Sequence, residues 1–168
     1  MKTLIFPGYS TKNKDWAYEA RRNIEGSHVY EWQHWLPSDT PAKFSVKTEV
    51  ENIKKIIGEK EINILGKSIG TLIAAVLLKE MKFKKIILCG IPVNDLSEDD
   101  AHHYSVLGDI DPSQIVVFQN SDDEHGSFEE VRKFLSQINP NIKIVEKPGR
   151  THDYPYFEDF KNFLNSGG

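Results

Sequence analysis

The segment NILGKSIGT, residues 63–71, contains a serine that two different chemistries use. Gly66-Lys67-Ser68 has the form in which a phosphate-binding P-loop ends, where the serine hydroxyl binds Mg²⁺ beneath a nucleotide. The longer stretch from Gly66 to Gly70 is G-x-S-x-G, the strand-to-helix turn that carries a nucleophilic serine. The first question is therefore whether Ser68 binds a metal or attacks a carbonyl carbon.

The residues before Gly66 argue against a P-loop. In G-x-x-x-x-G-K-[ST] the first glycine stands five residues before the second, and Glu61 occupies that position here. The residues between, 62–65, are of the β-forming type and leave no loop of backbone N–H groups to wrap a phosphate. We therefore favour the nucleophile turn.

The nucleophile turn fits its local context. A predicted strand, 62–65, leads into it, and a predicted helix, 69–81, leaves it. The serine of such a turn has a strained backbone that brings the flanking chain together, and Gly66 and Gly70 relieve that crowding. A tight turn without chemistry has the same local form, so the motif needs partner residues elsewhere in the chain.

Suitable partner residues follow downstream. A serine hydroxyl is a weak nucleophile and needs a general base that is oriented by an acid. The segment NSDDEHGSFEEV, after one predicted strand, offers Asp122 and Asp123, and His152 lies in the loop after the next predicted strand. The chain order serine, acid, histidine predicts a catalytic triad.

The elements that position these residues alternate along the chain. The predicted strands are 3–6, 29–32, 62–65, 85–89, 115–119 and 142–145, and the predicted helices are 15–24, 46–57, 69–81, 128–138 and 156–164. Near-continuous apolar strands with intervening helices predict a parallel sheet covered on both faces, a three-layer α/β/α sandwich. Ligand sites of such sheets lie outside the carboxyl ends of the strands, where Ser68 and its partners fall.

Length and composition predict one domain over residues 1–168, with the acidic, irregular segment 92–112 as a small cap-like excursion. The net charge of −4 argues against a nucleic-acid partner. The first ten residues are too short an apolar run for a signal peptide or a membrane span, and the single Cys89 excludes an internal disulfide framework. We therefore expect a cytoplasmic protein without a membrane partner.

These motifs resemble the α/β-hydrolase superfamily in a minimal, nearly lidless form. Asp123-Glu124-His125-Gly126 is similar to the D-x-x-G acid motif of that superfamily, and Gly149-Arg150-Thr151-His152 to its G-x-x-H histidine motif. LGKSIGT and the opening LIFPGYS are similar to segments of compact dienelactone-hydrolase-like and YdeN-like serine hydrolases. The resemblance extends over residues 3–164 and implies about six parallel strands in the order 2-1-3-4-5-6.

The resemblance also selects among the acids. Asp123 has the D-x-x-G spacing, Asp122 remains its rival, and Asp95 lies where some members carry the acid. Two early strands and a lid domain of larger members are missing, which leaves the substrate open.

The implied mechanism proceeds through an acyl-enzyme. Ser68 would attack the acyl carbonyl, His152 would transfer the proton, and Asp123 would orient the imidazole. The backbone N–H groups of Ile69 and Tyr9 would form the oxyanion hole, although a plain turn at Pro7-Gly8 without this role remains an alternative. No cofactor is implied.

Five residues are candidates for lining the substrate site: Tyr9, Lys67, His102, His103 and Tyr104. We expect Lys67 to be solvated, with an alternative role in favouring an anionic substrate. Because adjacent histidines do not share a helix face, His102 and His103 predict no metal site. The aromatic residues Trp32, His34 and Trp35 are interpreted as core or rim packing.

The sequence therefore predicts a serine hydrolase that acts on a small-molecule acyl substrate, a carboxylic ester first of all. Short acyl chains are expected, because a shallow cleft buries few methylene groups at about 0.8 kcal/mol each. A peptidase, amidase or thioesterase on the same triad, or a catalytically silent binding protein, remains an alternative. The oligomeric state stays open.

Overall fold

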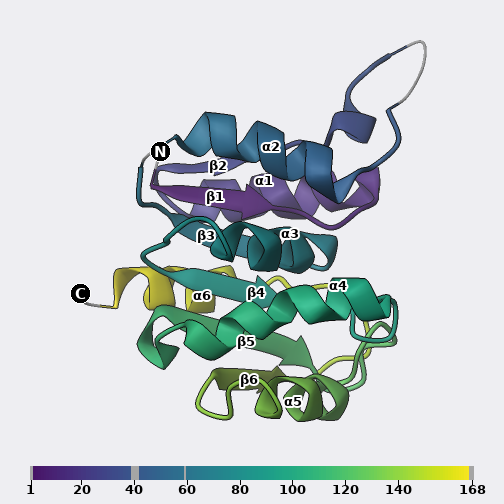
Figure 1. The fold of residues 1–168 in the computed structure, drawn as a ribbon, viewed down its shortest axis with the longest axis vertical. Coiled ribbons are helices and arrows are strands. Elements are labelled where there is room, and N and C mark those ends of the chain that lie inside the picture. Colours follow the sequence, from purple (N-terminus) through teal and green to yellow (C-terminus); the bar gives the residue numbers. More distant parts are fainter. Residues whose placement is uncertain (1, 39–41, 59, 167–168) are drawn as a thin grey trace.

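The computed structural model describes residues 2–38, 42–58 and 60–166, which form a three-layer α/β/α sandwich (Figure 1). The predicted sheet of six parallel strands is confirmed, in the order β2-β1-β3-β4-β5-β6. Its strands are β1 (Thr3–Phe6), β2 (Ser27–Val29), β3 (Asn63–Lys67), β4 (Ile86–Cys89), β5 (Ile115–Asn120) and β6 (Lys143–Lys147).

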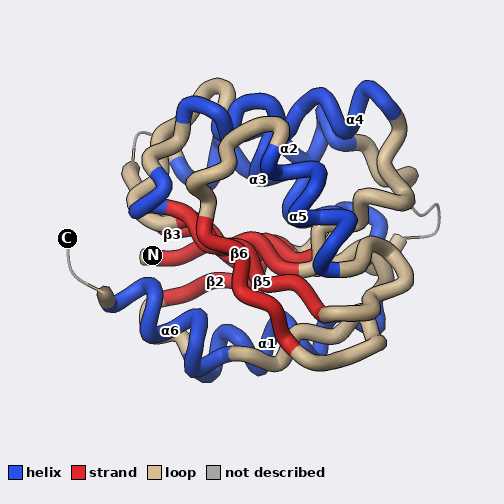
Figure 2. Tube along the Cα trace, turned by 90° about the horizontal axis from the view of Figure 1, so that it is seen from below, coloured by secondary structure: helices blue, strands red, loops and turns tan. Residues whose placement is uncertain are grey.

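Helices cover both faces of the sheet. They are α1 (Lys14–Asn23), α2 (Val46–Ile57), α3 (Ile69–Leu78), α4 (Glu98–His103), α5 (Phe128–Ser136) and α6 (Phe157–Asn165), with short 3-10 helices η1 (Thr11–Asn13), η2 (Gln33–Trp35), η3 (Tyr104–Asp109) and η4 (Pro112–Gln114). Figure 2 shows α1 and α6 on one side of the sheet and the other four α-helices on the opposite side.

Each strand supplies side chains to two separate cores, because successive side chains of a strand point to opposite faces. Leu4 and Ile64 pack beneath the helices α2 and α3, whereas Ile5 and Leu65 pack toward α1 and α6. This double burial explains why the strands read as continuous apolar runs.

Amphipathic patterns and caps account for the helices. In α2, Val50, Ile53 and Ile57 recur at three- and four-residue spacing and are buried, and Ser45 caps the helix by accepting a hydrogen bond from the Thr48 N–H. In α5, Ser127 and Glu130 form a capping box immediately after the loop that carries Asp123. The acid loop therefore ends at a firmly fixed helix terminus.

The second strand differs from its prediction. It was expected over residues 29–32, and the structure has it over Ser27–Val29. The Tyr30 N–H still donates to Ile5 O at 2.9 Å, but the chain then leaves the sheet edge. Trp32 is fully buried there, and its indole N–H donates to Gly8 O at 3.0 Å. Ring packing, and not strand pairing, determines the path of this aromatic segment.

The predicted irregular segment 92–112 contains α4, η3 and the start of η4. Tyr104 and Leu107 of η3 are buried, and the Tyr104 ring lies edge-on to Phe134 of α5 at 5.6 Å between centroids. The segment thereby packs onto the α3 and α5 side of the molecule. Within the part of the chain that the structure describes, no helix combines the length and apolarity needed to cross a membrane.

Candidate active site

Ser68 occupies a strained turn between β3 and α3. Its φ is 55° and its ψ is −122°, and no other non-glycine among the described residues has a positive φ. Such a conformation costs about 1–3 kcal/mol and is typical of functional sites. A Cβ on Gly66 would lie 2.7 Å from Gly70 O, and one on Gly70 would lie 2.2 Å from Phe6 O. Only glycine fits on either side of Ser68.

Asp123 and His152 are joined by a hydrogen bond of 2.7 Å between Oδ2 and Nδ1. Asp123 is buried, and its two oxygens also accept hydrogen bonds from the Tyr154 hydroxyl at 2.6 Å and the His125 N–H at 2.9 Å. Burial alone raises the pKa of Asp123, but the hydrogen bonds from His152 and Tyr154 outweigh burial and hold the pKa below its usual value. The carboxylate is therefore ionised and accepts three donors.

The rival acid, Asp122, points elsewhere. Its carboxylate is exposed and lies 3.8 Å from the guanidinium of Arg150, also exposed. An ion pair of this kind contributes little to stability. The structure thus brings Asp123, and not Asp122, to the imidazole of His152.

His152 carries one hydrogen-bonding atom without a partner. With Asp123 ionised, Nδ1 must carry a proton, so Nε2 presents a lone pair in the neutral form of the imidazole. This Nε2 is buried and has no hydrogen-bond partner, and the described structure has no hydrogen bond between it and Ser68 Oγ. In free enzymes such catalytic hydrogen bonds are often long and form only with substrate.

The end of β4 brings Ser68 and His152 together. The Ser68 N–H donates to Cys89 O at 3.0 Å. The next residue, Gly90, has a φ of 64°, and a Cβ there would lie 3.0 Å from His152 Cε1 and 2.5 Å from the Tyr154 ring. Ser68 and His152 therefore contact consecutive residues of the β4 terminus.

Asn120, at the end of β5, holds the histidine loop. Its Nδ2 donates to Thr151 O at 2.8 Å and to Asp153 O at 2.9 Å, the carbonyls on either side of His152. Its Oδ1 accepts from the Tyr156 hydroxyl at 2.6 Å. Asn120 was not among the predicted site residues, and its only signal in the sequence is a polar amide at the carboxyl end of a buried strand.

Tyr154 supports the acid and was likewise missed. It is fully buried, donates its hydroxyl to Asp123 and accepts from the Asn120 N–H at 3.2 Å. Burial and the hydrogen bond to Asp123 raise the pKa of Tyr154 well above its usual value, so the hydroxyl remains a donor.

The two predicted oxyanion-hole N–H groups, of Ile69 and Tyr9, are held in place in different ways. Ile69 is the first residue of α3, where N–H groups have no partner inside the helix. The Tyr9 N–H shares a peptide unit with Gly8 O, which accepts the buried Trp32 indole N–H. Because that peptide is trans, the Tyr9 N–H points in the direction opposite to the Trp32 ring.

The ring of Tyr9 is half exposed at 53% and stacks on His34 with 4.6 Å between centroids. The Tyr9 carbonyl accepts from the indole N–H of Trp35 at 2.7 Å and is 2.9 Å from Nε2 of His34. Trp32, His34 and Trp35 thus hold the loop after β1, a role beyond the expected packing.

Lys67 is not solvated, contrary to the expectation. Only 4% of the residue is exposed, because its side chain points to the α1 face of the sheet. Nζ donates to Asn13 Oδ1 at 2.7 Å, lies 3.7 Å from Asp153 Oδ1 and sits over the Trp16 ring at 5.2 Å. Burial lowers the pKa of Lys67, partly offset by nearby negative groups. Lys67 therefore supports the loop that carries His152 and does not line an open site.

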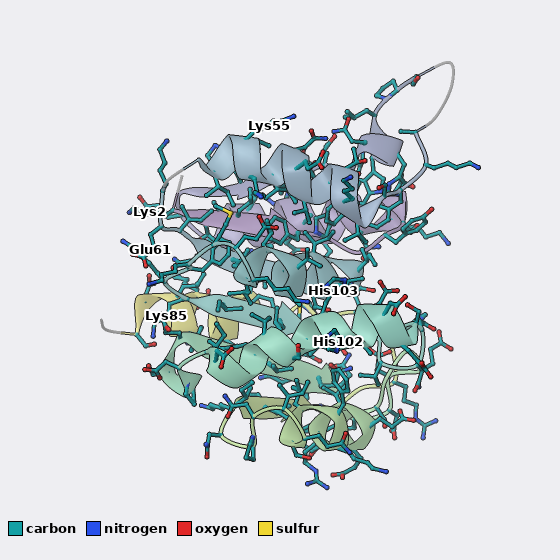
Figure 3. The ribbon with its side chains drawn as sticks, in the orientation of Figure 1. Lys2, Lys55, Glu61, Lys85, His102 and His103 are labelled. Atoms are coloured by element: carbon teal, nitrogen blue, oxygen red, sulfur yellow. The ribbon has the colours of Figure 1, made fainter. Side chains whose placement is uncertain are left out.

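Of the remaining lining candidates, Tyr104 is buried behind the turn, whereas His102 and His103 lie apart from it. Tyr104 is fully buried, and its hydroxyl is 2.6 Å from Thr71 Oγ1, which donates to Ser68 O at 2.7 Å. His103 Nδ1 is 3.0 Å from Lys79 Nζ, at the end of α3 that is remote from Ser68. His102 is exposed on α4 (Figure 3). Tyr104 thus supports the nucleophile turn from the core.

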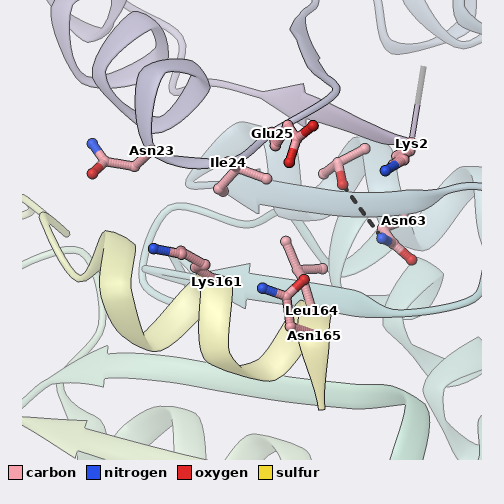
Figure 4. A pocket seen from close by; sticks show the side chains of 9 residues that line it. Lys2, Asn23, Ile24, Glu25, Asn63, Lys161, Leu164 and Asn165 are labelled. Carbon is pink, nitrogen blue, oxygen red and sulfur yellow. Dashed lines mark hydrogen bonds between the residues drawn. The ribbon is translucent and has the colours of Figure 1, made fainter. Parts of the chain in front are cut away.

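Other features of the described residues do not add to the site. Among the described residues, no group of three or more His, Cys, Asp or Glu side chains is placed to hold a metal ion. A cavity of about 230 Å³ is lined partly by Thr3 and Asn63, whose side chains are hydrogen-bonded at 3.4 Å (Figure 4). It lies at the amino ends of β1 and β3, whereas Ser68 follows the carboxyl end of β3.

Comparisons with known proteins identify the family of the chain and structures that share its fold. Residues 36–159 match the sequence model of a family described as alpha/beta hydrolase domain. No curated protein sequence shows significant similarity to the chain.

Several solved structures share the fold. A serine hydrolase homologue from Coxiella burnetii superposes with a TM-score of 0.71 at 17% identity, over 98% of this chain and 83% of that one. A YdeN-like hydrolase from Pectobacterium atrosepticum gives 0.67 at 14% identity, with 97% and 90% covered. A lidless serine hydrolase from Xanthomonas campestris gives 0.67 at 15%, with 97% and 78% covered.

Proposed function

Because the chain belongs to the alpha/beta hydrolase family, we propose that it is a serine hydrolase that cleaves a carboxylic ester through an acyl-enzyme. The observation that carries the proposal is the His152 imidazole, bonded through Nδ1 to the buried Asp123 and unpaired at Nε2. A neutral imidazole in this tautomer is what a general base for Ser68 requires. The strained backbone of Ser68 supports the same assignment.

The proposed reaction has two halves. In the first, Ser68 Oγ forms a bond to the acyl carbon while His152 Nε2 takes the hydroxyl proton, and Asp123 stabilises the imidazolium. The N–H groups of Tyr9 and Ile69 stabilise the oxyanion of the tetrahedral intermediate. As that intermediate collapses, His152 gives its proton to the departing alcohol. In the second half, water attacks the acyl-enzyme by the same route and releases the acid and Ser68.

A fluorophosphonate tests the nucleophile directly. We expect intact-protein mass spectrometry to find one adduct on the wild type and none on Ser68→Ala, with adduct formation on His152→Ala slower by about 10³-fold or more. Asp122→Asn is the matched control, because this exposed carboxylate does not contact His152. A folded wild type that forms no adduct would contradict the proposal and leave a binding protein as the alternative.

The kind of ester that we propose follows from the short loops at the carboxyl ends of the strands. α3 begins at the residue after Ser68, and only residues 121–127 separate β5 from α5. Such connections favour a shallow cleft that buries few methylene groups, each worth about 0.8 kcal/mol. We therefore propose small-molecule esters of short acyl chains. In a p-nitrophenyl ester series, kcat/KM should fall as the acyl chain lengthens.

A further inference from the structure

A second carboxylate–imidazole pair lies directly against the first. His125 Nδ1 is 2.5 Å from Asp95 Oδ2, and the His125 ring is 4.3 Å from the His152 ring, centroid to centroid, at an interplanar angle of 54°. Asp95 lies between β4 and α4, where the sequence suggested a remote rival for the triad acid. In the structure this carboxylate binds His125 instead of the catalytic imidazole.

The loop between β5 and α5 is tied to the segment after β4 at several points. The Asn94 N–H donates to His125 O at 3.0 Å, and Asn94 Nδ2 donates to Glu124 O at 3.3 Å. The His125 N–H in turn donates to Asp123 Oδ1 at 2.9 Å. The position of His125 is therefore coupled to the acid through the backbone and to the base through its ring.

The imidazole of His152 is enclosed by groups of different kinds. Gly90 approaches its Cε1, and the Tyr154 ring lies edge-on at 5.9 Å between centroids. The His125 ring is a further contact, and its own side chain is 38% exposed whereas that of His152 is 19% exposed. His125 thus stands on the solvent side, and without it the His152 ring would lose one of its packing partners.

We propose that His125, fixed by Asp95, is a positioning residue for the general base. This proposal rests on the proposed function, in which His152 must keep Nδ1 bonded to Asp123 and Nε2 directed to Ser68. The single hydrogen bond at Nδ1 fixes one atom of the ring and leaves the ring able to turn about that bond, so the direction of Nε2 needs a further restraint. Catalytic groups must be held within about 0.5 Å and 10–20° of the productive geometry, and the packed His125 ring supplies that restraint.

A merely structural role is distinguishable from this one. Neither Asp95 nor His125 belongs to the two hydrophobic cores. Their replacement should therefore leave the thermal midpoint close to that of the wild type, while the orientation of His152 changes.

The test compares paired variants. We expect His125→Ala to lower kcat by about 10–100-fold with little change in KM, because a small misplacement of a catalytic group costs up to about 10². His125→Phe keeps a packed ring and should recover most of the lost kcat, whereas Asp95→Ala should fall between His125→Phe and His125→Ala. Glu124→Gln is the matched control: its carboxylate lies 3.8 Å from the same imidazole but is 83% exposed, so kcat should stay within about twofold.

A second readout needs no substrate. In ¹⁵N-histidine-labelled protein, His152 should be the Nδ1–H tautomer in the wild type and a mixture of tautomers in His125→Ala. Unchanged kcat and an unchanged His152 tautomer in His125→Ala would overturn the proposal, as would a His125→Phe variant no better than His125→Ala. Absence of a fluorophosphonate adduct on the wild type would instead contradict the serine hydrolase proposal, and the tautomer of His152 would still test the role of His125.

Discussion

At the scale of single residues, the site depends on which of two adjacent aspartates is buried. Asp123 accepts three hydrogen bonds in a buried position, while Asp122 is exposed beside Arg150. The folded-state pKa of Asp123 lies below its unfolded value. Its contribution to stability is therefore fully present above the unfolded pKa and is lost as the pH falls through the folded pKa.

Replacement of these two aspartates should have very different effects. We expect Asp123→Asn to lower kcat by about 10³–10⁴, because the amide cannot hold the imidazole in the required tautomer. Asp122→Asn should change kcat by less than about twofold, as is usual for an exposed charge. Steady-state kinetics on a short p-nitrophenyl ester compare the two directly. Equal losses in both variants would refute the assignment of the acid.

The difference in unfolding free energy between the wild type and Asp123→Asn should also shrink between neutral and acidic pH. The wild type loses the contribution of the ionised Asp123 over that range, and the amide has none to lose. Urea unfolding at several pH values measures this change.

At the scale of elements, the carboxyl end of β5 organises the histidine loop. Asn120 donates to the two carbonyls that flank His152, so one strand terminus fixes both the acid loop and the base loop. The same molecule contains a comparable amide far from the site. Asn139, which is buried, donates through Nδ2 to Leu107 O at 3.1 Å and Ile110 O at 3.4 Å.

This pair of asparagines separates stability from catalysis. Asn120→Ala and Asn139→Ala should each lower the free energy of unfolding by about 1–3 kcal/mol, because each leaves two buried or partly buried carbonyl groups without their side-chain donor. Only Asn120→Ala should also lower kcat, by about tenfold or more, since it releases the loop that carries His152. Urea unfolding and kinetics on the same samples test both statements. An equal loss of kcat in Asn139→Ala would show that stability alone accounts for the effect.

The differences between prediction and structure have physical causes at this scale. Residues 30–32 have the composition of a strand, but the burial of Tyr30 and Trp32 directs the chain into the core past the end of β2. Lys67 lies in a turn that seemed open to solvent, yet the alternation of side chains along β3 places it on the α1 face with Leu65. Which face a residue reaches is decided by the sheet.

At the scale of the whole molecule, α3 packs closely against the carboxyl end of β1, and this contact fixes how the two elements lie beside Ser68. A Cβ on Gly70 would lie 2.2 Å from Phe6 O, a backbone atom that cannot move without the strand. At Gly108, by contrast, the nearest heavy atom would be Ile138 O at 3.5 Å, an ordinary contact.

We therefore expect Gly70→Ala to lower the free energy of unfolding by about 3 kcal/mol or more, since overpacking against backbone displaces an entire element. Gly108→Ala should remain within about 1 kcal/mol of the wild type. Urea denaturation followed by circular dichroism measures both. A Gly70→Ala variant as stable as the wild type would show that β1 and α3 separate easily.

The sequence by itself determined the architecture and the residue types of the site. Apolar runs alternating with helical patterns specify a parallel sheet, and G-x-S-x-G between a strand and a helix specifies the turn at Ser68, because both are properties of neighbouring residues. Only the tertiary structure decided which side chains hold the loops of the site in place. Asn120, Trp32 and His125 act on loops distant in the chain, and such contacts arise from the packing of the sheet and not from spacing along the sequence.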